Sequence, residues 1–243
     1  MKPFALLAGC LVVLVPAPSP AASAPVPETV VLLHGLGRTS WSMSALAREL
    51  EHAGFRVVNP SYPWRTQTLE QLASEWLPAQ LAALPPTPRV HLVTHSMGGL
   101  LVRVWLRDHS PPAQLGRVVM LAPPNAGSEI PDEFGASAPF RWLVGPNGPR
   151  LGTAADALPA TLGPWPAPAI ELGIIAGSGA SSASLGAAVP APHDGKVSVA
   201  STRLAGARDH RVLPFSHTWM AWRRETAAHV AHFLRHGRFV PES

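Results

Sequence analysis

The sequence predicts an α/β protein with a mostly parallel central sheet, helices on both faces of the sheet and a short cap after the fourth strand. Two observations support this fold class. Short apolar runs rich in β-branched residues alternate with longer runs of helical spacing, which is typical of strands joined by crossover helices. The 243 residues are 47% hydrophobic and only 14% charged, so the chain can build one domain with a full core.

The first part of the chain shows this alternation clearly. A β-branched run predicts a buried strand at 29–33, and the apolar spacing after it predicts a helix at 41–52 that Gly54 ends. A second strand is expected at 55–58, because this apolar run stops before Pro60.

The middle of the chain repeats the pattern. Leucine and tryptophan recur at helical spacing over 67–84 despite Pro78, so a helix is expected there. Apolar runs at 90–93 and 117–121 predict two strands, and the spacing between them predicts a helix at 97–108.

The last part begins with a long irregular segment. Residues 122 to about 169 are rich in proline and glycine, and ordinary connections are shorter than this. We therefore expect a cap-like excursion over the carboxyl ends of the strands, where such sheets bind ligands. Strands at 170–176 and 209–213 and a closing helix at about 217–234 complete a domain that we expect to span residues 25–243.

The N-terminus has the pattern of an export signal. Lys2 supplies a positive charge, the stretch from Phe4 to Val15 is apolar, and Ala22-Ser23-Ala24 offers small residues for cleavage. The apolar stretch is shorter than the roughly 20 residues that a membrane span needs. We expect a signal peptide over residues 1–24 and an exported protein, either periplasmic or secreted.

Lipidation is the alternative for the same segment. Leu7-Ala8-Gly9-Cys10 resembles the lipobox of bacterial lipoproteins, in which the cysteine carries the lipid. In that case the protein would be anchored through Cys10. Cleavage near Ala24 would instead leave no cysteine, and thus neither a disulfide nor a thiol nucleophile.

The charge pattern argues against a nucleic-acid partner. The formal net charge is +4, and lysine occurs only at Lys2 and Lys196, so the other basic residues are arginines. These arginines form no stripe interleaved with aromatic residues, which a nucleic-acid surface would show.

A serine stands where the strand at 90–93 gives way to the next helix, in the stretch VHLVTHSMGGLL. A turn this tight holds Ser96 in a sparsely populated backbone conformation and exposes its hydroxyl. It requires small neighbours, which Gly98 provides, and Gly99 eases packing of the helix on the strand. Thr94 stands where glycine is usual. His95 is expected to point away from Ser96, into packing beneath the turn.

Two motifs carry a family resemblance. "THSMGG" closely resembles the "GHSMGG" of lipases and esterases in the α/β-hydrolase superfamily. "APPNAGSEIPDEFG", after the fourth strand, resembles the corresponding stretch of bacterial lipase-like hydrolases, a branch that includes relatives of the GPI inositol-deacylase. The resemblance covers the chain from about Thr29 to Phe239, and Thr94 and the short proline-rich cap depart from it.

The resemblance implies a Ser-Asp-His triad and an oxyanion hole. Ser96 would be the nucleophile, and the chain order of the fold then selects Asp194 as the acid and His217 as the base. Asp194 lies in "HDGKVSVAST", whose Asp-Gly pair favours a turn, and His217 lies in "LPFSHTWM", where it is expected to open the last helix. His34-Gly35-Leu36-Gly37-Arg38 follows the first strand, so the oxyanion donors would be the N–H groups of Leu36 and Met97.

Other acids and histidines compete less well for these roles. Asp209 and His210 are neighbours on a strand and point to opposite faces, so they cannot both reach Ser96. His193 would compete with Asp194, and Asp156 comes before the strand that should precede the acid.

A second group of histidines lies at the end of the chain. His229, His232 and His236 share one helix face, where three imidazoles could bind zinc. No acidic or thiol partner accompanies them, and a solvated helix end is the preferred interpretation.

These patterns predict a serine esterase or lipase that needs no cofactor and no metal. Its substrate would be a small-molecule or lipid ester, and a peripheral contact with a membrane is left open. An acyltransferase with the same triad and a non-catalytic binding protein of this fold are the alternatives. Arg38 could meet an anionic group or only solvent. Four aromatic residues of the cap could line an acyl pocket or pack in the core: Phe134, Phe140, Trp142 and Trp165. Acyl chain length and oligomeric state are not predicted.

Overall fold

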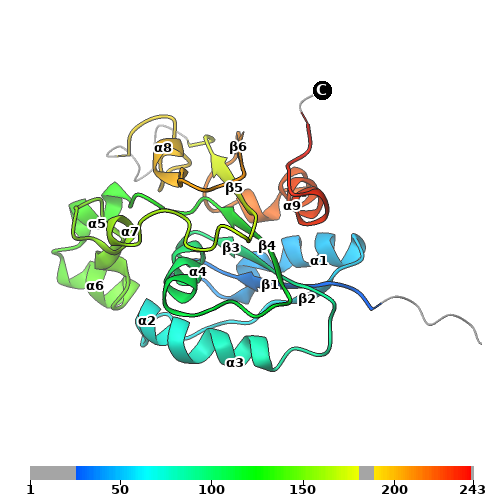
Figure 1. The fold of residues 1–243 in the computed structure, drawn as a ribbon. Helices are drawn as coiled ribbons and strands as arrows, with labels where there is room; N and C mark the ends of the chain where they lie inside the picture. Colours follow the sequence, from blue (N-terminus) through cyan, green and yellow to red (C-terminus); the bar gives the residue numbers. More distant parts are fainter. Residues whose placement is uncertain (1–25, 181–188, 242–243) are drawn as a thin grey trace, which may run out of the picture.

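The computed structural model describes residues 26–180 and 189–241 (Figure 1). The expected signal peptide and the alternative lipidation site at Cys10 lie outside the described residues and stay predictions. None of the helices in the described part of the chain combines the length and apolar composition that a membrane crossing requires.

Six parallel strands form one sheet in the order β2-β1-β3-β4-β5-β6. All six predicted strands are present, with their ends shifted by at most two residues: β1 (Thr29–Leu33), β2 (Arg56–Val58), β3 (Val90–His95), β4 (Leu115–Leu121), β5 (Leu172–Gly177) and β6 (Asp209–Leu213). The order reverses direction between β1 and β3. Ligands bind at the carboxyl ends of the strands beside such a reversal.

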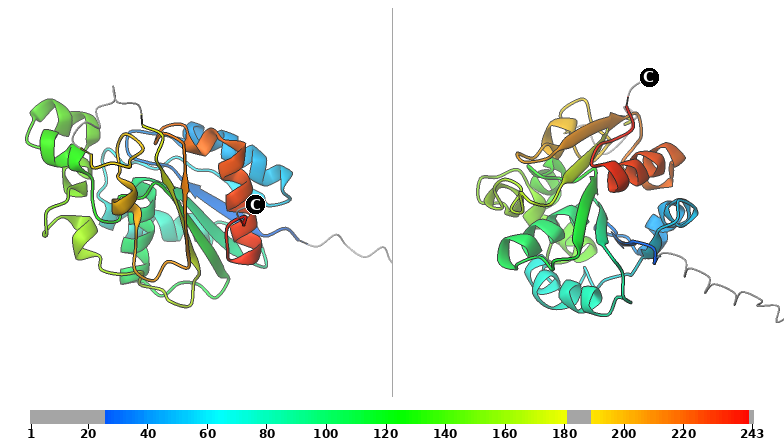
Figure 2. Two further views of the ribbon diagram at one scale, coloured as in Figure 1. Left: turned by 90° about the horizontal axis from the view of Figure 1, so that it is seen from above. Right: turned by 45° about the vertical axis from the view of Figure 1, so that its right-hand side comes forward.

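Helices cover both faces of this sheet, as predicted (Figure 2). Helices α1 (Ser44–His52) and α9 (Arg224–His236) pack together on one face, and α4 (Met97–Asp108) packs on the other. Strand side chains alternate between the two sides, so Val30 and Leu32 join one core cluster while Val31 and Leu33 join the other. The α/β class with a parallel sheet is therefore confirmed.

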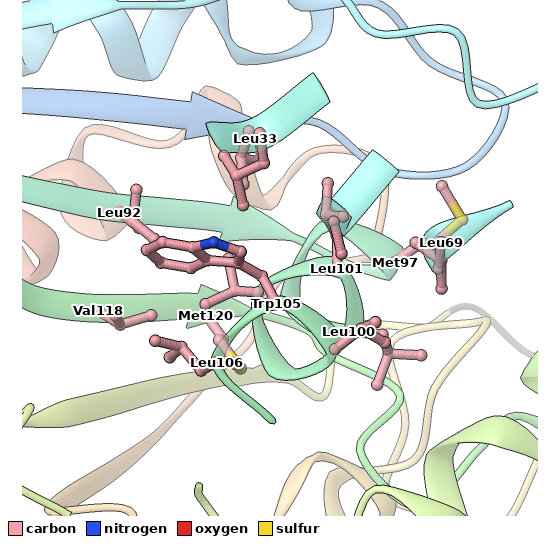
Figure 3. Close-up of a cluster of buried hydrophobic side chains, with 14 of the residues drawn as sticks. Leu33, Leu69, Leu92, Met97, Leu100, Leu101, Trp105, Leu106, Val118 and Met120 are labelled. Atoms are coloured by element: carbon pink, nitrogen blue, oxygen red, sulfur yellow. The ribbon is translucent and has the colours of Figure 1, made fainter. Parts of the chain in front are cut away.

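Figure 3 shows how α4 is seated on the sheet. Leu100, Leu101 and Trp105 of this helix pack against Leu92 of β3 and Met120 of β4, and all five are buried. The burial of these side chains fixes the helix that begins directly after Ser96.

The helix predicted at 67–84 is a composite of α2 (Leu69–Gln71), a π-helical segment η2 (Leu72–Trp76) and α3 (Leu77–Ala82). Pro78 lies in the first turn of α3 and has no N–H to donate to the preceding turn. The wider π turn before Pro78 accommodates this missing hydrogen bond and lets the helix continue.

The prediction that His217 opens the last helix is wrong. Helix α9 begins at Arg224, after a short 3-10 helix η5 (Met220–Trp222), and His217 lies in the loop between β6 and η5. The His217 N–H donates to the carbonyl of Asp194 at 2.9 Å, so this residue is held by a long-range contact and not by a helical one.

The segment between β4 and β5 contains four short helices: α5 (Glu129–Phe134), α6 (Ala138–Val144), a 3-10 helix η3 (Gly148–Leu151) and α7 (Leu158–Thr161). A further short helix, α8 (Val199–Thr202), precedes β6. None was predicted, because four to seven residues are too few to show helical periodicity. Asn147 ties the segment to the chain before α2, since its buried side chain accepts from Leu69 N–H and donates to the carbonyls of Trp64 and Gln67.

A buried arginine joins α4 to the same segment. The Arg103 guanidinium donates to the carbonyl of Asn125 at 2.9 Å and to that of Gly163 at 2.6 Å, and the residue is 1% exposed. Burial lowers the pKa of Arg103 to about 10, which keeps the side chain charged at neutral pH. The carbonyl groups that accept from Arg103 would lose their donor without it.

We therefore expect Arg103→Met to lower the free energy of unfolding by about 2–4 kcal/mol, because buried carbonyl groups are left unpaired. Arg107→Met is the matched control on the same helix, since Arg107 is exposed and its ion pair among the described residues is with its neighbour Asp108. That variant should lose less than about 1 kcal/mol. Denaturant titrations of the three proteins test this, and equal losses in both variants would contradict it.

Candidate active site

Ser96 lies between β3 and α4 with a left-handed backbone, at φ 54° and ψ −124°. The predicted strained turn is confirmed. Its N–H donates to the carbonyl of Leu121 at 2.8 Å, which fixes the turn to the neighbouring strand β4. The residue is half-buried, so its hydroxyl can meet a ligand at the end of the sheet.

The glycines after Ser96 permit this turn by their lack of side chains. A Cβ atom on Gly98 would lie 2.6 Å from the carbonyl oxygen of Leu33, a clash that backbone atoms cannot relieve. On Gly99 it would lie 3.3 Å from the Thr94 hydroxyl and 3.1 Å from Met120 Sδ. Thr94 therefore fits in place of the usual glycine because residue 99 leaves room for it.

The turn after β1 packs directly on Ser96. A Cβ atom on Gly35 would lie 3.0 Å from Ser96 Cβ and 3.0 Å from Nδ1 of His95. Leu36 is thereby held close to the serine. In the described part of the chain, no hydrogen bond uses the N–H of Leu36 or of Met97, so both donors are free for a ligand oxygen.

Tyr62 holds the same turn in place, a role that sequence reasoning missed. Its ring stacks on His34 at a centroid distance of 4.1 Å, and its hydroxyl donates to the carbonyl of His34 at 2.5 Å. Burial lowers the pKa of His34 and raises that of Tyr62, so both side chains stay neutral at pH 7. No sequence signal near Tyr62 predicts this contact, which joins positions 28 residues apart.

Asp194 lies in a tight turn after β5, as its Asp-Gly sequence predicted. Its Oδ1 accepts from the N–H groups of Lys196 at 2.9 Å and Val197 at 2.8 Å, and Gly195 has a left-handed φ of 100°. A Cβ atom on Gly177, at the end of β5, would lie 2.7 Å from Asp194 Cβ. The carboxylate is thus seated closely on the end of the sheet.

His217 and Asp194 form a hydrogen-bonded pair. The Nδ1–H of His217 donates to Oδ2 of Asp194 at 2.7 Å, and the two residues are 5% and 2% exposed. Burial would raise the pKa of Asp194, but the charge and hydrogen bond of His217 and the two backbone N–H groups lower it below 3.8. The acid is therefore a carboxylate at neutral pH and fixes the orientation of the imidazole.

His95 connects the serine turn to this pair. Its Nε2–H donates to the carbonyl of His217 at 2.9 Å, and the two imidazole rings lie 4.7 Å apart between centroids. Burial, with the charge of His217, lowers the pKa of His95 to about 3, so it stays neutral. His95 packs beneath the turn as expected, but its contact with His217 was not predicted.

These contacts bring the three predicted residues to one end of the sheet. Ser96 follows His95, whose ring contacts His217, and His217 binds Asp194. Between the described residues Ser96 and His217 no hydrogen bond is formed. Hydrogen bonds of this kind are often long in a ligand-free enzyme and shorten when substrate binds.

The competing residues have other partners. His210 Nε2 pairs with the hydroxyl of Thr202 at 2.9 Å, and Asp209 accepts from Phe239 N–H. His193 accepts from the N–H of Gly195, and Asp156 is exposed in the segment between β4 and β5.

The histidines of α9 are split between core and surface. His229 is largely buried, whereas the rings of His232 and His236 lie 4.4 Å apart near the helix end. Across residues 26–180 and 189–241, no three His, Cys, Asp or Glu side chains gather as metal ligands would.

The four aromatic residues considered for an acyl pocket lie in different surroundings. Trp165 is 5% exposed and belongs to the core, with its indole N–H bonded to the carbonyl of Ile170. Trp142 is 76% exposed, and only Phe134 and Phe140 contact each other.

The depressed pKa of Asp194 predicts how stability depends on pH. The ionised acid stabilises the folded protein above its ordinary pKa of 3.8, and this contribution is lost as pH falls through the lower folded-state value. Asp194→Asn should be less stable than the natural protein by about 1–3 kcal/mol at pH 6, and the gap should narrow below pH ~4. Denaturant titrations from pH 6 to pH 3 measure it, with exposed Asp156→Asn as the unaffected control, and a gap that widens in acid would contradict it.

This chain resembles known proteins in sequence and in structure. A family model described as "alpha/beta hydrolase fold" matches residues 28–146, and no curated protein matches the sequence. The lipase BlEst2 of Bacillus licheniformis in its propeptide form has a similar structure, with a TM-score of 0.66 and 17% identity over 91% of this chain and 53% of its own.

Two other solved structures are similar. Phospholipase PlaB from Legionella pneumophila has a TM-score of 0.64 and 17% identity, over 86% of this chain and 59% of its own. The metagenomic carboxyl esterase MGS0156 has a TM-score of 0.59 and 20% identity, over 83% of this chain and 68% of its own. This chain thus spans little more than half of the propeptide form of the lipase and of the phospholipase.

At these identities the likeness shows the fold, and the GPI inositol-deacylase branch stays a prediction. The parallel sheet with its strained serine turn, the family match and the solved structures all indicate the same fold. The chain has the α/β-hydrolase fold.

Proposed function

We propose that this protein is a serine hydrolase that cleaves carboxylic esters. The observation that carries the proposal is the joint placement of a strained, half-buried Ser96 and a buried Asp194–His217 pair at one end of the sheet. The similarity to a lipase, a phospholipase and a carboxyl esterase supports the same class of reaction.

The proposed first step is attack of the Ser96 oxygen on the acyl carbon. A serine hydroxyl is a poor nucleophile until a base takes its proton, and Nε2 of His217 is the ring nitrogen left free by the bond to Asp194. Asp194 holds this tautomer and stabilises the imidazolium that forms. The leaving alcohol then takes the proton from His217.

The N–H groups of Leu36 and Met97 would stabilise the negative charge on the former carbonyl oxygen. Both donors are held before substrate arrives, Leu36 by the Gly35 contact with Ser96 and Met97 by the buried start of α4. Preorganised donors of this kind contribute about 10²–10³ each to the rate. Water activated by His217 then releases the acyl group from Ser96, and each step uses residues of this chain alone.

Ser96→Ala should abolish labelling by a fluorophosphonate probe and lower kcat for a nitrophenyl ester by about 10⁴–10⁶. Ser178→Ala is the matched control, because Ser178 is also a half-buried serine directly after a strand of the sheet. It should keep full labelling and activity.

The outcome decides between the proposal and its alternatives. Absence of labelling in the natural protein would favour a non-catalytic binding protein. Labelling accompanied by ester products of an added alcohol, in place of free acid, would favour an acyltransferase.

The arrangement of the aromatic residues predicts a preference for short acyl chains. With Trp165 in the core and Trp142 exposed, a long chain finds few apolar partners in the cap. A longer acyl chain gains about 0.8 kcal/mol per CH₂ group only where that group is buried. We therefore expect kcat/KM for nitrophenyl esters to be highest at about four acyl carbons or fewer. A series from acetate to palmitate tests this, and a maximum at long chains would show that the cap provides an acyl site.

A further inference from the structure

Two cationic side chains belong to the turns that form the candidate active site. Arg38 ends the turn that carries Leu36, and Lys196 follows Asp194 by two residues. Lys196 is the only lysine in the described part of a chain that otherwise uses arginine. Their positions place two positive charges beside the proposed reaction centre.

Arg38 is held against the histidine loop. Its Nη2 donates to the hydroxyl of Thr218 at 3.1 Å, and Thr218 follows His217 directly. The side chain is half-buried, and among the described carboxylates none lies within ion-pair distance of its guanidinium. The donors not used by Thr218 are therefore available to another group.

The backbone of Lys196 is fixed by two hydrogen bonds, and the residue is exposed. Its N–H donates to Asp194 at 2.9 Å, and its carbonyl accepts from the Ser128 hydroxyl at 2.7 Å. Surrounding protein and the charge of Arg38 lower the pKa of Lys196, and the charge of Asp194 offsets part of this effect. Arg38 is bonded to the residue after His217, and Lys196 is bonded through its N–H to the carboxylate that His217 binds, so both cations belong to loops joined directly to this pair.

Six of the other sixteen arginines pair with a carboxylate within 4.0 Å, and all six lie outside the turns of the site: Arg89, Arg107, Arg117, Arg150, Arg208 and Arg224. Exposed arginines such as Arg48 and Arg141 have no carboxylate at that distance among the described residues either, and Arg38 differs from them in being half-buried against the histidine loop. A half-buried cation without such a partner carries an electrostatic cost that a bound anion would relieve.

We propose that Arg38 and Lys196 form a subsite for an anionic group, a carboxylate or a phosphate, that the substrate carries close to its scissile ester. The inference rests on the proposed ester hydrolase function and adds the substrate class to it. Arg38 donates from its fixed guanidinium, and the more mobile ammonium of Lys196 adapts to the anion.

Exposed tryptophans border the same site. Trp41, three residues after Arg38, is 67% exposed, and Trp219, two residues after His217, is 52% exposed. Both contact Trp222, at centroid distances of 4.8 and 6.3 Å. Apolar rings beside two cations suit an amphiphilic ester whose anionic group is near the bond that is cleaved.

Matched pairs of esters test the subsite. The butyrate ester of 3-hydroxy-4-nitrobenzoic acid is compared with 2-nitrophenyl butyrate, which places the charge on the alcohol. The 4-nitrophenyl monoesters of glutaric acid and of 4-phosphonobutanoic acid are compared with 4-nitrophenyl pentanoate, which places a carboxylate or a phosphonate on the acyl chain. The natural protein should have a higher kcat/KM for the anionic member of at least one pair.

Charge-removing variants assign this preference to the two residues. Arg38→Gln with Lys196→Gln should lower kcat/KM for the preferred anionic ester about tenfold and leave the neutral esters within about twofold. Raising the ionic strength should have the same selective effect on the natural protein. Arg38→Lys and Lys196→Arg, which keep the charge, should retain most of the preference, and Arg48→Gln on the exposed face of α1 should change nothing.

The outcomes separate this inference from the proposed function. Cleavage of neutral esters without any preference for anionic ones, or a preference that survives in the double variant, overturns the subsite alone. If no ester is cleaved, the proposed function fails. Calorimetric titration with glutarate and with neutral glutaramide then decides on the subsite: selective glutarate binding that the double variant loses supports it, and any other result rejects it.

Discussion

The candidate active site depends on the backbone conformation of Ser96. A non-glycine residue at φ 54° and ψ −124° costs about 1–3 kcal/mol, and it persists only where the surrounding structure leaves no alternative. Here β3 lies inside a fully paired sheet, and the buried face of α4 holds the helix that follows. The strain is therefore offset by the core, and the half-buried Ser96 is held where strand and helix meet.

Close backbone contacts transmit this constraint to the rest of the site. Gly98 touches the carbonyl of Leu33, and Gly35 touches Ser96, so the turn after β1 and the turn after β3 form one packed unit. Tyr62 secures the outer side of that unit through His34. Side chains at the two glycine positions would separate Ser96 from the N–H groups proposed as oxyanion donors, which explains why both positions are glycine.

The acid and the histidine are held differently, by hydrogen bonds between loops. Asp194 and His217 are joined by a side-chain bond of 2.7 Å and a backbone bond of 2.9 Å, and His95 adds a third bond to the carbonyl of His217. One half of the site is thus fixed by close packing and the other by polar contacts. In the proposed reaction, this second half would adjust to bring His217 into direct contact with Ser96.

The sequence by itself determined the order of strands and helices, the strained serine and the turn at Asp194, because apolar periodicity and glycine positions are local signals. It did not determine the short helices of the segment between β4 and β5, which have too few residues to show periodicity. It also did not determine the start of α9 at Arg224, because His217 is held in a loop by its hydrogen bonds to Asp194. The tertiary structure alone decided the contacts of Tyr62 with His34, of His95 with His217 and of Arg38 with Thr218. Each joins residues far apart in the chain, so it depends on how the sheet brings separate loops together and leaves no mark in any single stretch of sequence.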